Sequence, residues 1–278
     1  MAEITAAAVK AFREKTGLPM MDCKRALTEA EGNEDLAMEI LRKKGLAKMA
    51  EKMQERDTEE GTLAIYKADG VTAIVEVLCE SAPVASNPDF LQLANDIAEV
   101  VAKSEEFTKV EDLMAQPSPS KAGLTLQGQL EELFNRIREV FRVTRFQKYT
   151  GKVASYLHHD KKVGVLLLLE EGCEDAGRDI CMHIAAMRPE GLSETDIDST
   201  IIENERRVQK ELLDADPANA KKPENIKEKI LNGRMAAFLA QKCLLSQEFV
   251  KDSSKTVGQY AKDAGLKITG FVHWILGK

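Results

Sequence analysis

Residues 61–103 read GTLAIYKADGVTAIVEVLCESAPVASNPDFLQLANDIAEVVAK. Alternation predicts one strand over residues 63–67, and the more apolar residues 71–78 predict a second, with Asp69 and Gly70 as the tight turn between them. After a loop, apolar residues recur at helical spacing, at Phe90, Leu93, Ile97 and Val101. Because the hairpin and the helix each have one apolar side, we expect them to pack together.

The same order of elements returns over residues 151–189, GKVASYLHHDKKVGVLLLLEEGCEDAGRDICMHIAAMRP. A second apolar strand is expected at 163–169 and a helix at 179–187. The two hairpins match at one constant offset in three residue pairs: Gly61 and Gly151, Ala64 and Ala154, Tyr66 and Tyr156. The repeat predicts an α+β fold with a duplicated core of two small antiparallel sheets with packed helices. Chance similarity of two hairpins is the alternative that three pairs leave open.

Composition and charge restrict the class of function. The 278 residues are enough for two domains, or for one domain with insertions. A net charge of −7 and a sequence pI of about 5.4 provide no basic field, and 5% aromatic residues provide few stacking platforms, so we expect no direct nucleic-acid partner. Residues 1–15 are charged and amphipathic, and no apolar run is long enough to span a membrane. We therefore expect a cytoplasmic protein without a signal peptide or a membrane partner.

Cysteine and histidine do not form a recognisable reactive site. The five cysteines are odd in number and form no CxxC pair, so neither a disulfide framework nor a metal site is indicated and no cofactor is expected. Cys23 is predicted to be a small buried residue. His183 lies within an expected helix without a nucleophile or metal ligand beside it, so the chain is not expected to be an enzyme.

The first 46 residues predict a compact module of three short helices. Gly17 is placed to end the first helix, and a second runs from about Met20 to Ala30. Asn33 can cap a third helix over 34–44, which Gly45 is expected to close. One of the two methionines, Met20 and Met21, is expected to be buried and the other exposed. The charged residues 47–60 are expected to link this module to the core.

Several motifs resemble the elongation factor Ts family. Residues 16–27, TGLPMMDCKRAL, followed by EAEGN at 29–33, resemble its N-terminal signature. HIAAMRP at 183–189 resembles its second core motif. Four further stretches resemble its C-terminal segment: GRM at 233–235, LLSQ at 244–247, FVKD at 249–252 and KTV at 255–257. The motifs occur in the order of the family and cover nearly the whole chain.

The resemblance implies a fold and a partner. Residues 1–46 would form a module similar to ubiquitin-associated domains, with 61–149 as a first core subdomain and 150–278 as a second. The implied function is that of a guanine nucleotide exchange factor for the GTPase elongation factor Tu, which it would bind in GDP-bound and nucleotide-free forms. The implied partner contacts are Met20, Met21, Asp22 and His183. A homodimer formed through the complex is left open.

One loop departs from the family. At the position where the family usually has Thr-Asp-Phe-Val, a segment associated with dislodging magnesium from the partner, this chain has Ser81, Ala82, Pro83 and Val84. A methyl group cannot perturb the oxygen ligands of a cation, and proline offers neither an N–H nor a phenyl ring. The loop is therefore either a plain connection or a weakened partner contact. An adaptor that binds elongation factor Tu without efficient exchange is the alternative function. Nearby, Glu80 and Asp89 are expected to be solvated.

Residues 193–231 predict a helical hairpin inserted in the second core subdomain. Its apolar seam is narrow, which is similar to the coiled-coil protrusion of the family. An RNA-binding arm is the rival interpretation because lysines cluster there, at Lys221, Lys222, Lys227 and Lys229. The interspersed Glu224 and Glu228 favour a solvated, ion-paired face.

Two further elements are expected outside the hairpins and the insertion. After a linker at 116–123, an amphipathic helix should extend through Phe141 with a basic outer side formed by Arg136, Arg138, Arg142 and Arg145. Phosphate binding by these arginines is the alternative to a plain exposed face. The last strand is expected around 268–275.

Overall fold

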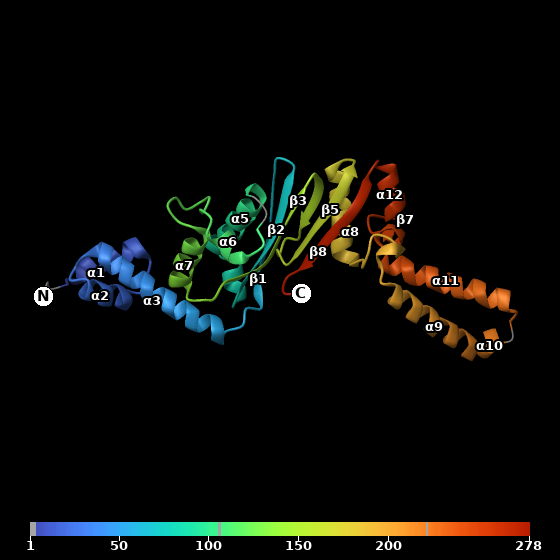
Figure 1. Ribbon diagram of the computed structural model, residues 1–278, viewed down its shortest axis with the longest axis horizontal. Helices are drawn as coiled ribbons and strands as arrows, with labels where there is room; N and C mark the ends of the chain where they lie inside the picture. The colour runs from blue at the N-terminus through green and yellow to red at the C-terminus, as the bar shows by residue number, and fades with distance from the viewer. Residues whose placement is uncertain (1–3, 105–106, 221) are drawn as a thin grey trace. The chain divides into compact units, whose positions relative to one another are not determined.

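The computed structural model describes residues 4–104, 107–220 and 222–278 (Figure 1). The chain forms two compact units. The first comprises the chain up to Tyr149 together with His159–Lys162 and Ile275–Lys278. The second comprises Thr150–His158 and Val163–Trp274. The short turn and the C-terminal residues that belong to the first unit are distant from it in sequence.

Three helices open the first unit: α1 (Ala6–Thr16), α2 (Met20–Glu29) and α3 (Glu34–Glu55). Their ends follow the local signals. Gly17 is left-handed (φ 67°) at the end of α1, and the Asn33 side chain accepts a hydrogen bond from the Leu36 N–H at 3.1 Å at the start of α3. The three helices bury a cluster of their own that includes Cys23. The predicted helical module and the buried Cys23 are confirmed.

The third helix continues beyond Gly45, contrary to expectation. It extends to Glu55, so nine of the fourteen residues expected to form a linker, 47–60, are helical. Gly45 lies where α3 approaches α7 (Leu126–Ile137): a Cβ built on it would lie 2.0 Å from Asn135 Oδ1. This glycine therefore permits a close helix contact instead of ending a helix.

The first sheet has the order β1-β2-β3, with β1 Glu60–Ala68, β2 Val71–Cys79 and β3 Arg142–Thr150. The predicted hairpin is confirmed, because β1 and β2 pair antiparallel and Ala68 faces Val71 across the turn. The helix α5 (Pro88–Lys103) lies against both strands and shares one buried cluster with them. The short helices α4 (Ala82–Ala85) and α6 (Val110–Met114) flank α5 in sequence.

The expected long helix ends early. The structure ends α7 at Ile137, and Arg138 is left-handed (φ 68°). The buried Val140 and Phe141 follow this turn, and the basic residues beyond them form β3. The four arginines do not share one face. Each has its own acceptor: Asp89 for Arg136, Asp22 for Arg138, the Arg56 carbonyl for Arg142 and Glu76 for Arg145. The structure thus provides no combined phosphate site from these residues.

The second unit repeats the arrangement. Its sheet has the order β4-β5-β8, with β4 Lys152–Leu157, β5 Val163–Glu171 and β8 Lys267–Ile275, and α8 (Glu174–Met187) packs on β4 and β5. Ala64 and Ala154 are both buried, and Gly61 and Gly151 both have positive φ. The duplicated α+β core and the last strand are confirmed. Not anticipated were the hairpin of β6 (Glu248–Phe249) and β7 (Asp252–Thr256), the helix α12 (Val257–Asp263), and two 3-10 turns, Glu194–Asp196 and Leu244–Ser246.

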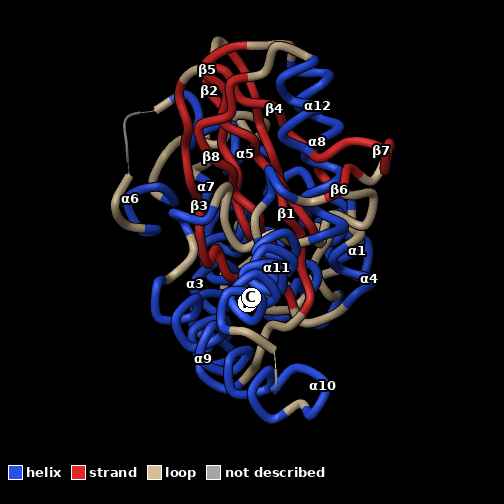
Figure 2. The backbone as a smooth tube through the Cα atoms, turned by 90° about the vertical axis from the view of Figure 1, so that its right-hand side faces the viewer, coloured by secondary structure: helices blue, strands red, loops and turns tan. Residues whose placement is uncertain are grey.

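The helical hairpin is longer than expected. It consists of α9 (Ser199–Ala215) and α11 (Glu224–Lys242), with the short α10 (Pro217–Ala220) at the turn between them (Figure 1 and Figure 2). The second helix thus ends at Lys242 and not near Leu231. Lys227 pairs with Asp214 at 2.9 Å across the hairpin, as an ion-paired face requires. Of the expected lysine cluster, Lys221 lies outside the described residues.

The outer part of the helical hairpin, residues 206–234, is expected to be dispensable for folding. The buried residues of the whole hairpin, Leu213, Leu231 and Met235, form a small cluster separate from the core of the second unit. Replacing residues 206–234 by a short Gly-Ser loop should therefore lower Tm by only a few degrees, about 1–2 kcal/mol of stability. Calorimetry measures this directly. Loss of cooperative unfolding in the shortened protein would contradict the prediction.

Candidate partner-binding site

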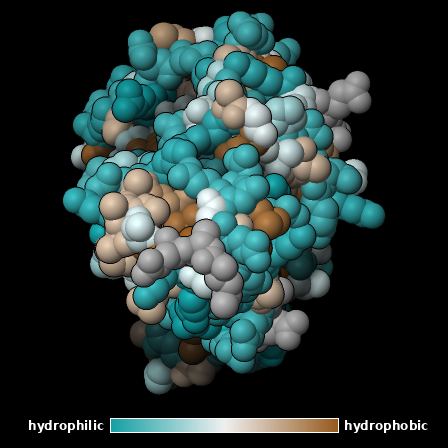
Figure 3. Space-filling model, turned by 90° about the vertical axis from the view of Figure 1, so that its left-hand side faces the viewer, coloured by the Kyte–Doolittle hydropathy of each residue, from teal (hydrophilic) through white to brown (hydrophobic). Residues whose placement is uncertain are grey.

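The methionine pair begins α2 and lies at the surface. Met20 is 47% exposed and Met21 is 61% exposed, so the expectation that one of them is buried is wrong. Leu36 and Met38 on α3 are also exposed, at 44% each. Figure 3, which views the N-terminal end of the chain, shows apolar side chains interspersed with hydrophilic ones on this face. Flexible thioethers suit adaptable contacts with a protein partner.

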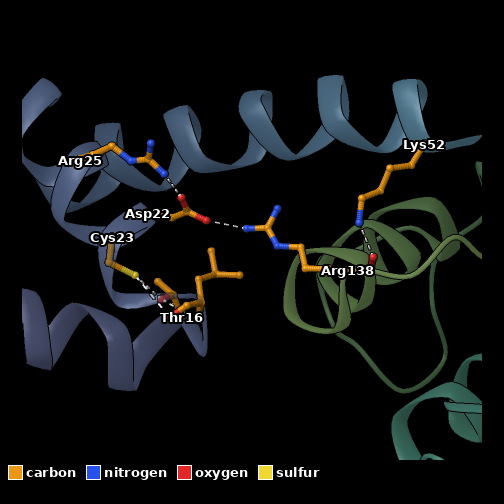
Figure 4. Close-up of polar contacts among 7 residues, drawn as sticks. Thr16, Asp22, Cys23, Arg25, Lys52 and Arg138 are labelled. Atoms are coloured by element: carbon orange, nitrogen blue, oxygen red, sulfur yellow. Dashed lines mark hydrogen bonds and ion pairs between the residues drawn. The ribbon is translucent and has the colours of Figure 1, made fainter. Parts of the chain in front are cut away.

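Asp22 follows the methionine pair, and its side chain contacts other residues of the same chain. Its side chain is 16% exposed. One carboxylate oxygen pairs with Arg25 of the same helix, and the other accepts from Arg138 Nη2 at 2.7 Å (Figure 4). Beneath it, the Cys23 thiol lies 3.4 Å from Thr16 Oγ1. Both oxygens of the expected contact residue Asp22 are thus used within the chain, and its contact with a partner stays a prediction.

The three residues after α7, 138–140, contact the N-terminal helices and the start of the loop that departs from the family sequence. This loop, residues 81–84, is called the departing loop below. The Arg138 side chain binds Asp22, and its carbonyl accepts from Lys52 Nζ at 2.5 Å. Glu139 accepts hydrogen bonds from the Ser81 hydroxyl at 2.6 Å and from the Ser81 N–H at 3.1 Å. The Val140 N–H donates to Glu80 Oε1 at 2.8 Å. The sequence contained no signal for this turn, because residues 138–140 read as part of the helix.

The departing loop is an ordered turn. Ser81 precedes α4, which presents Ala82 and Pro83 to solvent, while Val84 is half-buried against the core cluster. Glu80 is not a solvated carboxylate as expected, because it also accepts from Arg56 Nη1 at 2.8 Å and is only 18% exposed. Before it, burial raises the pKa of the Cys79 thiol to about 12. The loop therefore offers a small apolar surface, formed by Ala82 and Pro83, without a free acid.

His183, the fourth expected contact, is buried at 1% exposure. Its Nδ1 accepts from the Val250 N–H at 3.2 Å, and its Nε2 lies 2.8 Å from Gln247 Oε1. This network places the proton on Nε2, and burial lowers the pKa of the imidazole, which favours the neutral form. Val250, whose N–H binds His183, is 56% exposed; it lies in the FVKD motif, but the sequence did not predict it as a surface contact. His183 holds the backbone of that residue, and its own partner contact stays a prediction.

Neither a metal-binding group nor a membrane-spanning helix is found among the described residues. Within residues 4–104, 107–220 and 222–278, no group of three or more His, Cys, Asp or Glu could hold a metal ion. Across the same ranges, no helix has the length and apolar character needed to cross a bilayer. Burial also raises the pKa of Cys181 to about 12, which keeps that thiol protonated.

Comparisons with known proteins show which family the chain belongs to. Residues 83–278 match the family described as Elongation factor TS. Proteins named Elongation factor Ts are similar along nearly the whole chain. The one from Methylococcus capsulatus is 40% identical over 280 residues, covering 99% of this chain and 92% of its own. The one from Azoarcus sp. is 41% identical, with coverage of 100% and 92%, and that from Hydrogenobaculum sp. is 39% identical, with 97% of each chain covered. By this similarity, the chain belongs to the elongation factor Ts family.

Proposed function

We propose that this chain is a guanine nucleotide exchange factor that binds elongation factor Tu and promotes GDP release during translation elongation. The observation that carries the proposal is the similarity of 97% or more of the chain to proteins named Elongation factor Ts. The factor makes and breaks no covalent bond itself. The neutral, buried His183 and the protonated Cys79 and Cys181 thiols agree with that role.

Linkage describes how such a factor works. If it binds nucleotide-free elongation factor Tu more tightly than the GDP-bound form, it must weaken GDP binding by the same factor. A surface on the first unit, Met20 and Met21, and one on the second, Val250, are exposed and apolar. We propose that these two surfaces contact the partner. Contacts at separate points can shift the elements that hold the phosphates and the magnesium ion of a GTPase.

Stopped-flow measurement of GDP release tests the proposed function. Elongation factor Tu loaded with a fluorescent GDP analogue is mixed with excess unlabelled GDP, with and without this protein. We expect release to be accelerated in a manner that saturates with the concentration of this protein. If GDP release is unchanged at a concentration where calorimetry shows binding, the adaptor function is the one that remains. No observation on this chain specifically favours it. Absence of binding would reject both functions.

The departing loop is expected to contribute little to exchange. Ala82 and Pro83 are exposed and carry no acid, while Ser81 is held by Glu139. Pro83→Ala should therefore change the rate of GDP release by less than about tenfold, which is about 1.4 kcal/mol of barrier. Ala82→Asp combined with Pro83→Phe should raise the rate, most visibly at high magnesium. GDP release rates measured for the wild type and the two variants across a magnesium series test this prediction. A large decrease in the release rate with Pro83→Ala would mean that the present loop itself promotes exchange.

A further inference from the structure

The turn that ends α7 holds the helix that carries the methionine pair. Asp22 lies in the first turn of α2, directly after Met21, and its carboxylate is bound by Arg138 Nη2 at 2.7 Å (Figure 4). The two side chains are 16% and 26% exposed. An ion pair that is shielded in this way is screened less by salt than a fully exposed pair. The contact joins residues that are 116 positions apart in the sequence.

Arg138 makes a second link through its backbone. Its carbonyl accepts from Lys52 Nζ at 2.5 Å, and the same ammonium lies 5.6 Å from the centroid of the Phe134 ring. Because Lys52 belongs to α3, one residue holds α2 through its side chain and α3 through its carbonyl. The close approach of Gly45 to Asn135 adds a packing contact between α3 and α7. The region around the end of α7 therefore holds α2 through Asp22 and α3 through Lys52 and Gly45.

The backbone of Arg138 indicates which part of this residue matters. It lies in the left-handed region (φ 68°), and its N–H donates to the Phe134 carbonyl at 2.7 Å to close α7. Glycine adopts this conformation freely, whereas a side chain there is strained. An arginine at this position is therefore unfavourable for the turn itself. Its favourable contribution comes from the guanidinium group, which binds Asp22.

We propose that Arg138 is a positioning residue for partner docking: by holding Asp22 it orients the first turn of α2, so that Met20 and Met21 are ordered before the partner binds. The inference rests on the proposed function. A docking element that is ordered in advance loses less conformational entropy on association. Loosening α2 should therefore weaken the complex even though every residue that contacts the partner is still present.

Arg138→Gly separates positioning from folding. The substitution removes the bond to Asp22, keeps the carbonyl that binds Lys52, and relieves the strained backbone. We expect Tm to be unchanged or raised, and binding to nucleotide-free elongation factor Tu to weaken about tenfold, mainly through faster dissociation. Arg138→Lys retains the positive charge and should recover part of the affinity. Calorimetry of the full chain gives affinity and Tm.

Lys103→Ala is the control for the change in net charge. Lys103 is 56% exposed, lies on α5 and pairs with Glu99. Its replacement removes one positive charge without touching α1, α2 or α3, so the affinity should match that of the wild type. Weakening comparable to that of Arg138→Gly would attribute the effect to charge and overturn the inference.

A double-mutant cycle distinguishes positioning from a purely structural role, because only positioning couples the effect of Arg138 on affinity to the methionine pair. Met20→Ala combined with Met21→Ala removes the contact that Arg138 orients, so adding Arg138→Gly should weaken binding by less than about twofold more. A full tenfold loss in that background, or equal affinity of Arg138→Gly and the wild type, would overturn the inference and leave the proposed function intact. If the wild-type chain does not bind elongation factor Tu, the proposed function itself fails.

Discussion

Replacing Arg145 by methionine is expected to lower the free energy of unfolding by about 3–5 kcal/mol, because it leaves a buried carboxylate without its cation. That carboxylate belongs to Glu76 on β2, which is 3% exposed. It accepts from Arg145 at 2.8 Å, from the Thr144 hydroxyl at 2.6 Å and from the Gly277 N–H at 3.0 Å. Arg145 also donates to the Ile275 carbonyl at 2.8 Å. The pair therefore joins β2, β3 and the C-terminal residues of the first unit.

The double variant Glu76→Met with Arg145→Met is the matched control. Replacing both charges by apolar groups of similar size removes the uncompensated charge, so the double variant should be more stable than Arg145→Met alone by about 1 kcal/mol or more. Urea denaturation of the three proteins, with constant m-values, measures the differences. If Arg145→Met lowered the free energy of unfolding by less than about 1 kcal/mol, the carboxylate of Glu76 would have to be solvated or paired with another group.

Replacing His183 by alanine is expected to lower the free energy of unfolding by about 3 kcal/mol. The substitution removes the acceptor of the Val250 N–H and a partner of Gln247, which is 4% exposed. It also opens a space beside Phe249, whose ring centroid lies 5.9 Å from that of the imidazole. Because Val250 is one of the proposed contact residues, binding to elongation factor Tu should weaken as well. Denaturation and calorimetry measure the two effects, and unchanged stability would contradict the network.

The same histidine predicts a pH dependence. Burial lowers the pKa of His183 below its ordinary value of 6.5, so below that pH the unfolded chain binds more protons than the folded chain. The contribution of His183 is therefore fully present above about pH 6.5 and declines as the pH falls toward the folded-state pKa. Burial and the nearby Arg188 also lower the pKa of His273, so the comparison of wild type with His183→Ala isolates one residue. The stability difference between them should shrink as the pH falls below 6.5, and a constant difference would contradict the prediction.

Local patterns in the sequence were sufficient for the repeated unit. Alternation at period two and the Asp69-Gly70 turn predicted the pairing of β1 with β2, and helical spacing predicted α5. Capping residues predicted where α1 ends and where α3 begins. These features depend on residues close together in the chain, whose conformational preferences act before any distant contact forms. The family motifs are of the same kind, since each is a short, continuous stretch.

Distant contacts decided the remaining features. The sequence pattern placed the basic residues of β3 on one face of a helix. In the structure they form a strand, in which Arg145 pairs with Glu76, 69 residues away in the sequence. Gly45 read as a helix end, but Asn135 on another helix needs the space that its missing side chain leaves. Asp22 and His183 were predicted as surface contacts, and the structure binds one to Arg138 and buries the other against Val250. Such roles depend on which groups meet after the chain has folded, because burial and pairing, not residue type alone, set how a charged or polar side chain is used.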